Sequence, residues 1–277
     1  MIQRLAPGLL LSALIGGLGY WRRALSASGL LGAILVGTVI FGLGGWLWGL
    51  LLITFFVSSS WLSHYRRAAK EAIADKFAKG SRRDLGQTLA NGGLGALLAV
   101  AFALDPDPLF FAAFLGVIGS VTADTWATEL GVLSRMSPRL ITSGQEVTAG
   151  TSGGVTWLGV WASLAGALLI GAAATALTQA ASLLRGSGWQ LNAVSYSLLA
   201  MIGGVAGSLF DSLLGATVQG IYFCDYCEKQ TERRIHRCGR STRLVRGWKW
   251  LNNDVVNLAA SAVGGLTAAL LALLVWR

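Results

Sequence analysis

Acidic residues inside apolar stretches are the first candidates for chemistry in this sequence. Asp124, Glu129, Asp211 and Asp254 lie within or beside long runs of apolar residues. A charged side chain near the centre of a membrane helix costs about 2.5–3.5 kcal/mol on insertion scales, so such residues usually line a polar cavity or a functional site. We predict that these four carboxylates are catalytic. Asp124 and Asp211 would bind Mg²⁺, which prefers a few carboxylates completed by water and phosphate oxygens.

Helix capping is the simpler explanation for part of this set. Asp254 follows Asn252 and Asn253 at the start of the last apolar run, and Asn91 stands near the start of another. Asx residues commonly cap helices. The sequence is therefore compatible with Asp254 and Asn91 as caps. It is also compatible with Asp254 at the site and with Asn91, Asn252 and Asn253 contacting a nucleotide.

Basic residues and a glycine-rich turn supply partners for an anionic substrate. We predict phosphate contacts from Lys76, Arg82, Arg83 and Arg139, and from the turn Gly150-Thr151-Ser152-Gly153-Gly154. Backbone amides of such a turn can hold phosphate where it enters a helix. The turn lacks the Gly-Lys-Ser/Thr ending of a Walker A motif, so a close packing contact of small residues is the alternative.

The three cysteines lie together in one basic loop beside a histidine. Cys224, Cys227, His236 and Cys238 follow the pattern C-x2-C-x8-H-x-C, which suits a tetrahedral structural Zn²⁺. The alternative is three reduced thiols, with His236 binding phosphate or lipid headgroups. An odd number of clustered cysteines argues against a disulfide framework and indicates a reducing compartment.

The composition predicts a membrane protein rather than a soluble one. Hydrophobic residues make up 54% of the 277 residues and charged residues only 13%, with mean hydropathy +0.60. Soluble domains carry roughly 25% charged residues. We predict an all-α, polytopic bundle forming a single membrane domain over residues 1–277. About eight spans are expected, near 5–20, 28–43, 46–62, 89–104, 109–130, 154–177, 193–219 and 255–276.

The distribution of basic residues predicts the orientation of this bundle. The loops on one side, 21–27, 63–88, 131–153 and 220–254, hold 19 of the 22 lysine and arginine residues. By the positive-inside rule this side is cytoplasmic, which puts both termini outside. Topology also explains the net charge of +9 without nucleic acid as a partner. We expect an integral plasma-membrane protein with its active site on the cytoplasmic side.

The first apolar run resembles a secretory signal peptide, but its flanking residues favour a retained helix. Trp21-Arg22-Arg23 separates the run from the small residues that a signal peptidase would need, which is the wrong order for processing.

Two spans share a short motif. Gly119-Ser120 precedes Asp124, and Gly207-Ser208 precedes Asp211. Repeated helical units often form a site at their interface, although so short a match also arises by coincidence.

Several ordered blocks together resemble the membrane family that contains plant phytyl-phosphate kinase and animal transmembrane protein 19. The blocks are ADTWATE (123–129), PRLIT (138–142), GTSGGV (150–155), GSLFDSLLGA (207–216), CDYC (224–227), HRCG (236–239) and WLNND (250–254). The resemblance implies phosphoryl transfer from a nucleoside triphosphate, such as CTP, to an isoprenyl monophosphate such as phytyl phosphate. The implied partners are the nucleotide, the prenyl phosphate and membrane lipids.

Two other functions use the same residues. A transporter or scramblase of an anionic lipid or small solute would use the acidic residues as a cation or proton site. A lipid-phosphate cytidylyltransferase would transfer CMP instead of a phosphoryl group.

Overall fold

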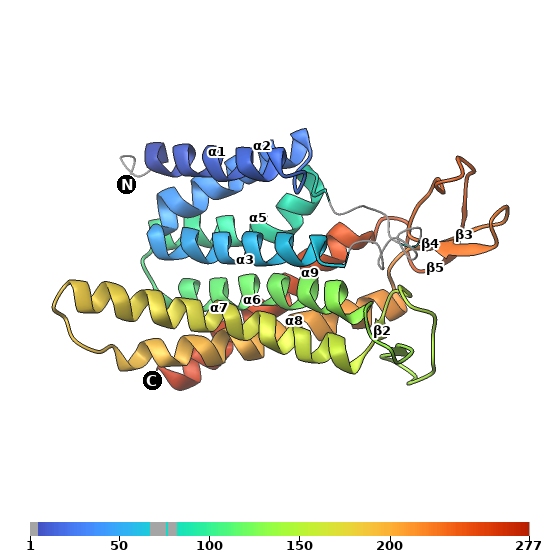
Figure 1. Cartoon of the computed structure of the whole chain (residues 1–277). Helices are drawn as coiled ribbons and strands as arrows, with labels where there is room; N and C mark the ends of the chain where they lie inside the picture. The colour runs from blue at the N-terminus through green and yellow to red at the C-terminus, as the bar shows by residue number, and fades with distance from the viewer. Residues whose placement is uncertain (1–4, 67–75, 77–81, 277) are drawn as a thin grey trace.

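The computed structural model describes residues 5–66, 76 and 82–276, and helices dominate this part of the chain (Figure 1). Seven of its helical segments are long and apolar enough to cross a membrane, and α1 is a shorter apolar helix. The predicted all-α polytopic bundle is therefore confirmed. The helices are α1 (Leu5–Trp21), α2 (Ala27–Val39) with its π-helical extension η2 (Ile40–Gly44), α3 (Trp46–His64), α5 (Leu85–Leu104), α6 (Pro108–Gly131), α7 (Trp157–Leu184), the 3-10 turn η3 (Leu191–Val194), α8 (Ser195–Thr217) and α9 (Asn253–Val275).

Short strands gather at one end of the bundle. Strands β1 (Arg139–Leu140) and β2 (Gly154–Val155) form an antiparallel pair. A second sheet has the order β4-β3-β5, formed by β3 (Ile221–Cys224), β4 (Lys229–Thr231) and β5 (Arg243–Arg246). Four of these strands lie in the predicted basic loops, whereas β2 occupies the first residues of the span predicted near 154–177. Both sheets lie at the end opposite the start of α1 and the end of α9 (Figure 1). Which end faces the cytoplasm stays a prediction.

Helix α5 begins a turn earlier than expected because of its cap. Asp84 and Gln87 form a reciprocal capping box, in which each side chain accepts a hydrogen bond from the other residue's backbone N–H. This arrangement satisfies two N–H groups that would otherwise lack partners. Asn91 therefore lies inside the helix, and the prediction that it caps this helix is wrong.

The starts of two later helices also differ from the prediction. Asn252 is the N-cap of α9, where its side chain accepts a hydrogen bond from the Val255 N–H. Asp254 lies in the first turn instead of at the cap. Thr156 caps α7 through the Gly159 N–H. The glycine-rich turn is thus separated from α7 by strand β2 and does not itself enter the helix.

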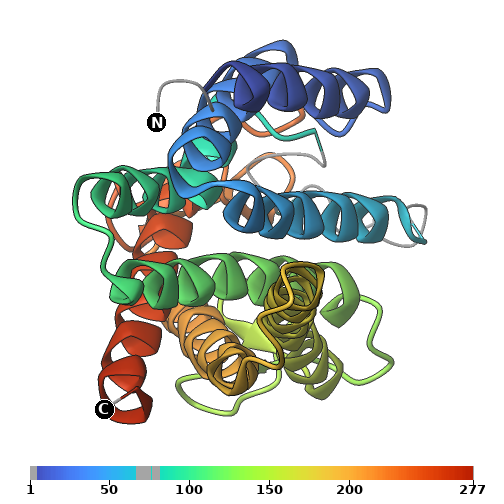
Figure 2. The ribbon, with the colours of Figure 1, turned by 90° about the vertical axis from the view of Figure 1, so that its left-hand side faces the viewer.

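Helix α6 occupies the centre of the molecule and packs against α3, α5, α7, α8 and α9. Figure 2 shows α1 and α2 on one side and α7, α8 and α9 on the other, with α3 and α5 between α6 and the first pair. The chain thus forms an outer layer of N-terminal helices over a bundle built around α6.

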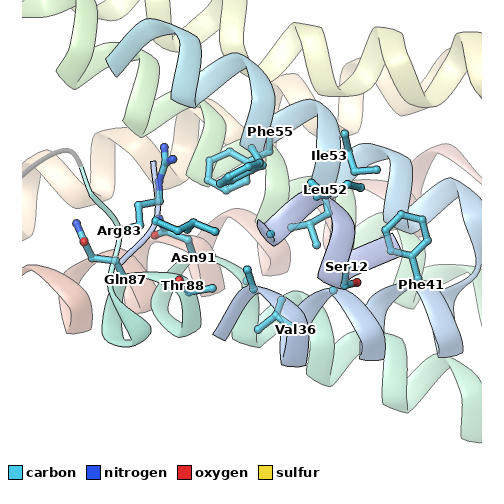
Figure 3. Close-up of a pocket in the computed structure, with 17 residues that line it drawn as sticks. Ser12, Val36, Phe41, Leu52, Ile53, Phe55, Arg83, Gln87, Thr88 and Asn91 are labelled. Carbon is cyan, nitrogen blue, oxygen red and sulfur yellow. The ribbon is translucent and has the colours of Figure 1, made fainter. Parts of the chain in front are cut away.

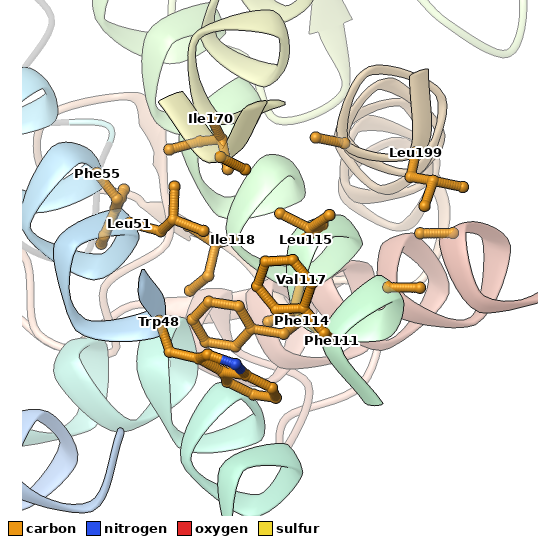
Figure 4. Packing of buried hydrophobic residues seen from close by; sticks show 14 of the residues in the cluster. Trp48, Leu51, Phe55, Phe111, Phe114, Leu115, Val117, Ile118, Ile170 and Leu199 are labelled. Atoms are coloured by element: carbon orange, nitrogen blue, oxygen red, sulfur yellow. The ribbon is translucent and has the colours of Figure 1, made fainter. Parts of the chain in front are cut away.

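The hydrophobic core surrounds the first half of α6 (Figure 4). The Trp48 ring lies 4.3 Å from that of Phe114 and 5.5 Å from that of Phe111, measured between centroids. Leu115 and Ile118 are fully buried against them. Because dense packing of this kind holds side chains in single arrangements, this half of α6 is a rigid support for the half that follows.

Candidate functional site

The site begins at a close contact between α6 and α8. A Cβ atom added at Gly207 would lie 2.0 Å from the Ser120 Oγ, so only glycine allows this approach. Residues four apart share a helix face, which places Asp124 one turn beyond Ser120 and Asp211 one turn beyond Gly207. The shared Gly-Ser motif therefore brings two aspartates to the same level on neighbouring helices.

Both aspartates line a polar cavity of about 660 Å³ at the end of the bundle that carries the strands. The cavity is bounded mainly by α6, α8, the start of α7 and the loop between β1 and β2. The residues predicted for the site that line it are Asp124, Glu129, Asp211, Arg83, Asn91, Gly150, Thr151, Ser152, Gly153, Gly154 and Asn253. The structure thus gathers most of the predicted set around one space, while their catalytic roles stay predictions.

The carboxylate of Asp211 lines the cavity without full hydrogen bonding. Its Oδ2 is buried and has no hydrogen-bond partner in the part of the chain that the structure describes. It interacts electrostatically with the carboxylates of Asp124 and Glu232. Buried like charges favour a bound cation or a proton. This site therefore fits a bound cation or a proton.

Glu232 reaches the cavity from the basic C-terminal loop and was not predicted. Its Oε1 accepts hydrogen bonds of 2.9 Å from the Ser152 Oγ and from the Gln219 Nε2. Within the described residues, no three carboxylates lie close enough together to hold one ion. A metal here would therefore depend on two carboxylates, with the remaining ligands supplied by water or substrate oxygens.

Arg83 also lines the cavity, from the segment that precedes α5. Its side chain is buried, and its NH1 donates a hydrogen bond of 3.0 Å to the Ser60 Oγ. Burial lowers the pKa of Arg83, and the negative charge of Glu129 acts in the other direction. An arginine remains protonated in such surroundings. Glu129 itself accepts a hydrogen bond of 2.5 Å from the Ser63 Oγ.

The glycine-rich turn is seated directly against the end of α8. Gly153 has φ +83°, and a Cβ there would lie 2.4 Å from the Ala216 backbone nitrogen. The amides of Thr151 and Gly154 donate within the turn, to the carbonyls of Thr148 and Thr151. These two N–H groups are used by the turn, which leaves those of Gly150, Ser152 and Gly153 as the candidates for an anion.

Three predicted basic residues lie away from the cavity. Lys76 fixes the loop instead, because its Nζ donates hydrogen bonds of 2.6 Å to the Thr148 Oγ1 and the Ala149 carbonyl. Burial, and then the nearby charge of Lys229, lower the pKa of Lys76. Arg139 forms an exposed ion pair of 2.8 Å with Glu146. Lys76 thus positions the glycine-rich turn rather than lining the site.

Arg82 is exposed and donates to the Leu25 carbonyl, with its NH2 at 3.2 Å. Asn252 and Asp254 belong to the first turn of α9 and its cap, and neither is among the cavity-lining residues. Much of the predicted basic loop 63–88 lies outside the described residues, namely 67–75 and 77–81.

The cavity also contains polar residues that the sequence analysis did not assign. These are Ser63, Gln87, Gln219, Glu232, Arg237 and Asn257, among others. One sequence signal was present for Gln87, since it lies four residues before Asn91 and shares one face of α5 with it. No comparable signal exists for Glu232 or Arg237, which come from an irregular loop.

The four Cys/His side chains lie together beside the cavity. The ligand atoms of Cys224, Cys227, His236 and Cys238 are all within 4.8 Å of one another. The Cys224 and Cys238 sulfurs are 3.7 Å apart, and the His236 Nδ1 is 3.3 Å from the Cys238 sulfur. Tetrahedral Zn²⁺ with Zn–S bonds of about 2.3 Å separates two sulfurs by about 3.8 Å. The cluster therefore has the donor set and spacing of a closed metal site.

The thiols in this cluster differ in acidity. A hydrogen bond from the Arg240 backbone, followed by one from His236, lowers the pKa of Cys238 to about 6. Hydrogen bonding to Cys238 is the main cause that raises the pKa of Cys227 to about 11. A thiolate at Cys238 suits metal binding, because the thiolate and not the thiol is the ligand.

Comparison with known proteins places the chain among integral membrane proteins. The family model described as integral membrane protein DUF92 matches residues 10–265. Protein PGR of Arabidopsis thaliana is 34% identical, over 93% of this chain and 92% of its own length. The uncharacterized membrane protein MJ0933 of Methanocaldococcus jannaschii is 31% identical, over 90% of this chain and 86% of its own length. Protein VTE6, chloroplastic, of Arabidopsis thaliana is 25% identical, over 89% and 65%.

No solved structure matches the chain. The family match covers nearly all of the helices around the cavity, and together with the relatives it confirms the family resemblance noted from the sequence blocks.

Proposed function

The chain belongs to the DUF92 family of integral membrane proteins, and on this premise we propose that it is a membrane-embedded kinase of isoprenyl monophosphates. The donor would be a nucleoside triphosphate such as CTP, and phytyl phosphate is a representative acceptor. The observation that carries the proposal is the shared cavity. It combines two carboxylates on neighbouring helices, a buried arginine and a glycine-rich turn. This combination suits two phosphate groups and a cation.

The proposed reaction is a direct phosphoryl transfer. An oxygen of the acceptor monophosphate forms a bond to the γ-phosphorus of the donor, and the bond between that phosphorus and the β-γ bridging oxygen breaks. The products are the prenyl diphosphate and the nucleoside diphosphate. A phosphate monoester is already ionised and nucleophilic, so the site needs positioning and charge stabilisation more than a strong base.

Each wall of the cavity has a distinct role in this proposal. Asp124 and Asp211 would hold Mg²⁺, which neutralises charge on the donor phosphates when bound. The unpaired carboxylate oxygen of Asp211 fits that role. Arg83 would bind phosphate oxygens, and amides of the Gly150–Gly154 turn would orient the donor.

The Cys/His cluster would hold Arg237, one of the residues that line the cavity, in place. We propose that Cys224, Cys227, His236 and Cys238 bind a structural Zn²⁺. Arg237 lies in the sequence between two of these ligands and lines the cavity. Metal binding would therefore fix Arg237 at the site without placing the metal in contact with substrate.

Metal analysis of the purified protein tests the zinc site. We expect close to one zinc per chain, lost in His236→Ala and kept in His64→Ala, which alters the other of the two histidines. A zinc content that is near zero in the unaltered protein, or equal in both variants, would remove the zinc assignment.

The proposed location follows from the charge distribution. The cavity is lined in part by residues of the basic loops, among them Glu232 and Arg237, so the positive-inside rule predicts a cytoplasmic active site. In a cell without plastids the membrane would be the plasma membrane. Labelling of Gln145→Cys, at an exposed position of the loop between β1 and β2, by a membrane-impermeant thiol reagent tests this orientation in sealed vesicles. Labelling above that of the unaltered protein is expected only from the cytoplasmic side, and labelling only from the other side would contradict the proposed orientation.

The decisive assay measures products from purified protein. We expect radiolabelled farnesyl or phytyl phosphate, with CTP and Mg²⁺, to give the prenyl diphosphate and CDP. Release of pyrophosphate with a CMP-linked lipid would instead identify a cytidylyltransferase. No turnover, together with nucleotide-independent flux of anionic lipid or solute in liposomes, would replace the enzyme by a transporter.

A further inference from the structure

A narrow apolar crevice lies among the N-terminal helices, beside the polar cavity (Figure 3). Its volume is about 70 Å³. The apolar walls come from α1, α2, α3 and α5, and include Ile15, Ala33, Val36, Leu52 and Phe55. This crevice adjoins the core around Trp48, with which it shares Val36 and Phe55.

The crevice and the polar cavity meet at one set of residues. Arg83, Gln87 and Asn91 line both of them. Figure 3 shows these three side chains together at one end of the crevice, with Ser12 and Phe41 toward the other end. A molecule occupying both spaces would therefore have a polar head beside Arg83 and an apolar chain directed away from it.

We propose that this crevice binds the hydrocarbon chain of the isoprenyl monophosphate, with its phosphate beside Arg83. The identity of the headgroup depends on the proposed kinase function, whereas the placement of the chain depends on the crevice itself. The occupant is a single-chain lipid phosphate.

The environment of Arg83 supports this orientation. Its guanidinium carbon lies 5.7 Å from the Phe55 ring centroid and 5.8 Å from that of Phe56, so its side chain packs on the apolar wall. Arginine pairs with phosphate through a planar fork of donors and also stacks on aromatic rings. Arg83 is therefore suited to the boundary between a phosphate and a hydrocarbon chain.

The volume of the crevice argues against two chains. A space of about 70 Å³ between packed helices has no room for the paired chains of a diacyl phospholipid, and a single hydrocarbon chain would already fill it. Its walls include small residues such as Gly16, Ala33 and Gly92, so a larger side chain there would obstruct the chain. The crevice thus favours a prenyl phosphate over a phosphatidate as acceptor.

Photo-crosslinking locates the chain without any need for turnover. The probe is a farnesyl phosphate analogue with a diazirine on its terminal isoprene unit, added to the full chain in detergent micelles. We expect crosslinked peptides from α1, α2 or α3, and competition by geranylgeranyl phosphate. Crosslinks confined to α7, α8 or α9 would overturn the proposed placement.

Crevice-filling variants test the same placement by chain-length selectivity. Each excluded methylene weakens binding by about fourfold, so Ala33→Leu should raise the KM for a C20 prenyl phosphate by about tenfold. The KM for C5 isopentenyl phosphate should change less than about twofold. Ile53→Ala, which widens the crevice, should instead reduce the discrimination between C15 and C20 chains. If both variants kept the unaltered chain-length profile, the crevice would not be the chain site.

Ala27→Leu is the matched control, because Ala27 lies exposed on the same helix and does not line the crevice. Its chain-length profile should match that of the unaltered protein. If the unaltered protein turned over no prenyl phosphate, the kinase proposal would fail, and the crosslinking result would still decide where the chain binds.

Discussion

The two halves of helix α6 differ in burial and in polarity. From Phe111 to Val121 most side chains are buried, and this half packs against Trp48 and the surrounding apolar residues. From Asp124 to Glu129 the same helix lines the polar cavity. The first half therefore supplies rigidity, and the second half presents charged groups whose position depends on that rigidity.

Stability depends mainly on the apolar half of α6, and the proposed function depends on the polar half. The apolar half uses close packing, whose loss destabilises the protein. The polar half places Asp124 near Asp211 of α8, whose buried Oδ2 has no hydrogen-bond partner among the described residues. Groups of this kind are retained at functional sites although they do not favour folding. Substitutions in the two halves should consequently affect different measurements.

The largest expected effect comes from Asp211. Asp211→Asn preserves the shape of the side chain but removes its charge, so kcat should fall by about 1,000-fold while the thermal unfolding midpoint is unchanged or higher. The measurement is the initial rate of CDP formation with farnesyl phosphate. Asp225→Asn is the control, because Asp225 is exposed and paired with Arg243 outside the cavity. A kcat for Asp211→Asn within threefold of the unaltered protein would contradict the role of this carboxylate.

Phe114→Ala should lower stability and leave kcat almost unchanged, the reverse of the effect expected for Asp211→Asn. Its ring is fully buried against Trp48, so truncation should lower the free energy of unfolding by about 3 kcal/mol. Detergent-solubilised protein and chemical or thermal unfolding give this value. The kcat per folded molecule should stay near that of the unaltered protein, and Leu97→Ala, at an exposed position of α5, should cost less than about 0.5 kcal/mol. A large loss of kcat at full stability would show that the two halves are not separable.

Arg83 and Arg82 are adjacent in the sequence, but Arg83 is buried at the cavity and Arg82 is exposed. Arg83→Gln should raise the KM for the prenyl phosphate by about 30-fold, because it removes a charge-assisted contact in a buried site. Arg82→Gln should change it by less than about twofold, since Arg82 is exposed and donates to the Leu25 carbonyl. Steady-state kinetics on both variants measure the difference. Equal effects would mean that the basic loop acts through general charge rather than through the buried arginine.

A smaller effect is expected from Arg237. Arg237→Ala should raise the nucleotide KM by about tenfold, because a cavity-lining cation is lost. Arg240→Ala, three residues further along the loop and stacked on Tyr226, should leave it almost unchanged. Zinc content should be equal in the two variants, since neither alters a ligand side chain. If Arg237→Ala lost zinc, its effect on KM would report disruption of the loop.

Much of the fold could be predicted from the sequence because lipid imposes simple constraints. Span lengths, glycine-rich contacts and the basic loops all follow from the need to bury the backbone and to place charge on one side. The start of α5 was missed because the Asp84 and Gln87 capping box is a local signal within a polar segment. The short strands were missed because their pairing depends on the loops that they close.

The candidate site residues could be predicted where a short stretch of sequence is enough to reveal them. Asp124 and Asp211 stand out as acids in apolar helices, and the four Cys/His residues follow one spacing. By contrast, the sequence predicts which loop holds a basic residue but not whether its side chain reaches the cavity. Arg83 does reach the cavity, whereas the exposed Arg139 pairs with Glu146. Glu232 could not be predicted, because only the fold brings its loop beside Asp211.

A double-mutant cycle on Asp124 and Asp211 tests the central claim most directly. Both carboxylates are proposed to act on the same ion and phosphate, so the rate of prenyl diphosphate formation should fall steeply in Asp124→Asn and in Asp211→Asn. The double variant should be little slower than either single variant, because residues that act as a unit are not additive. Fully additive losses, or near-normal rates in folded single variants, would contradict a shared site.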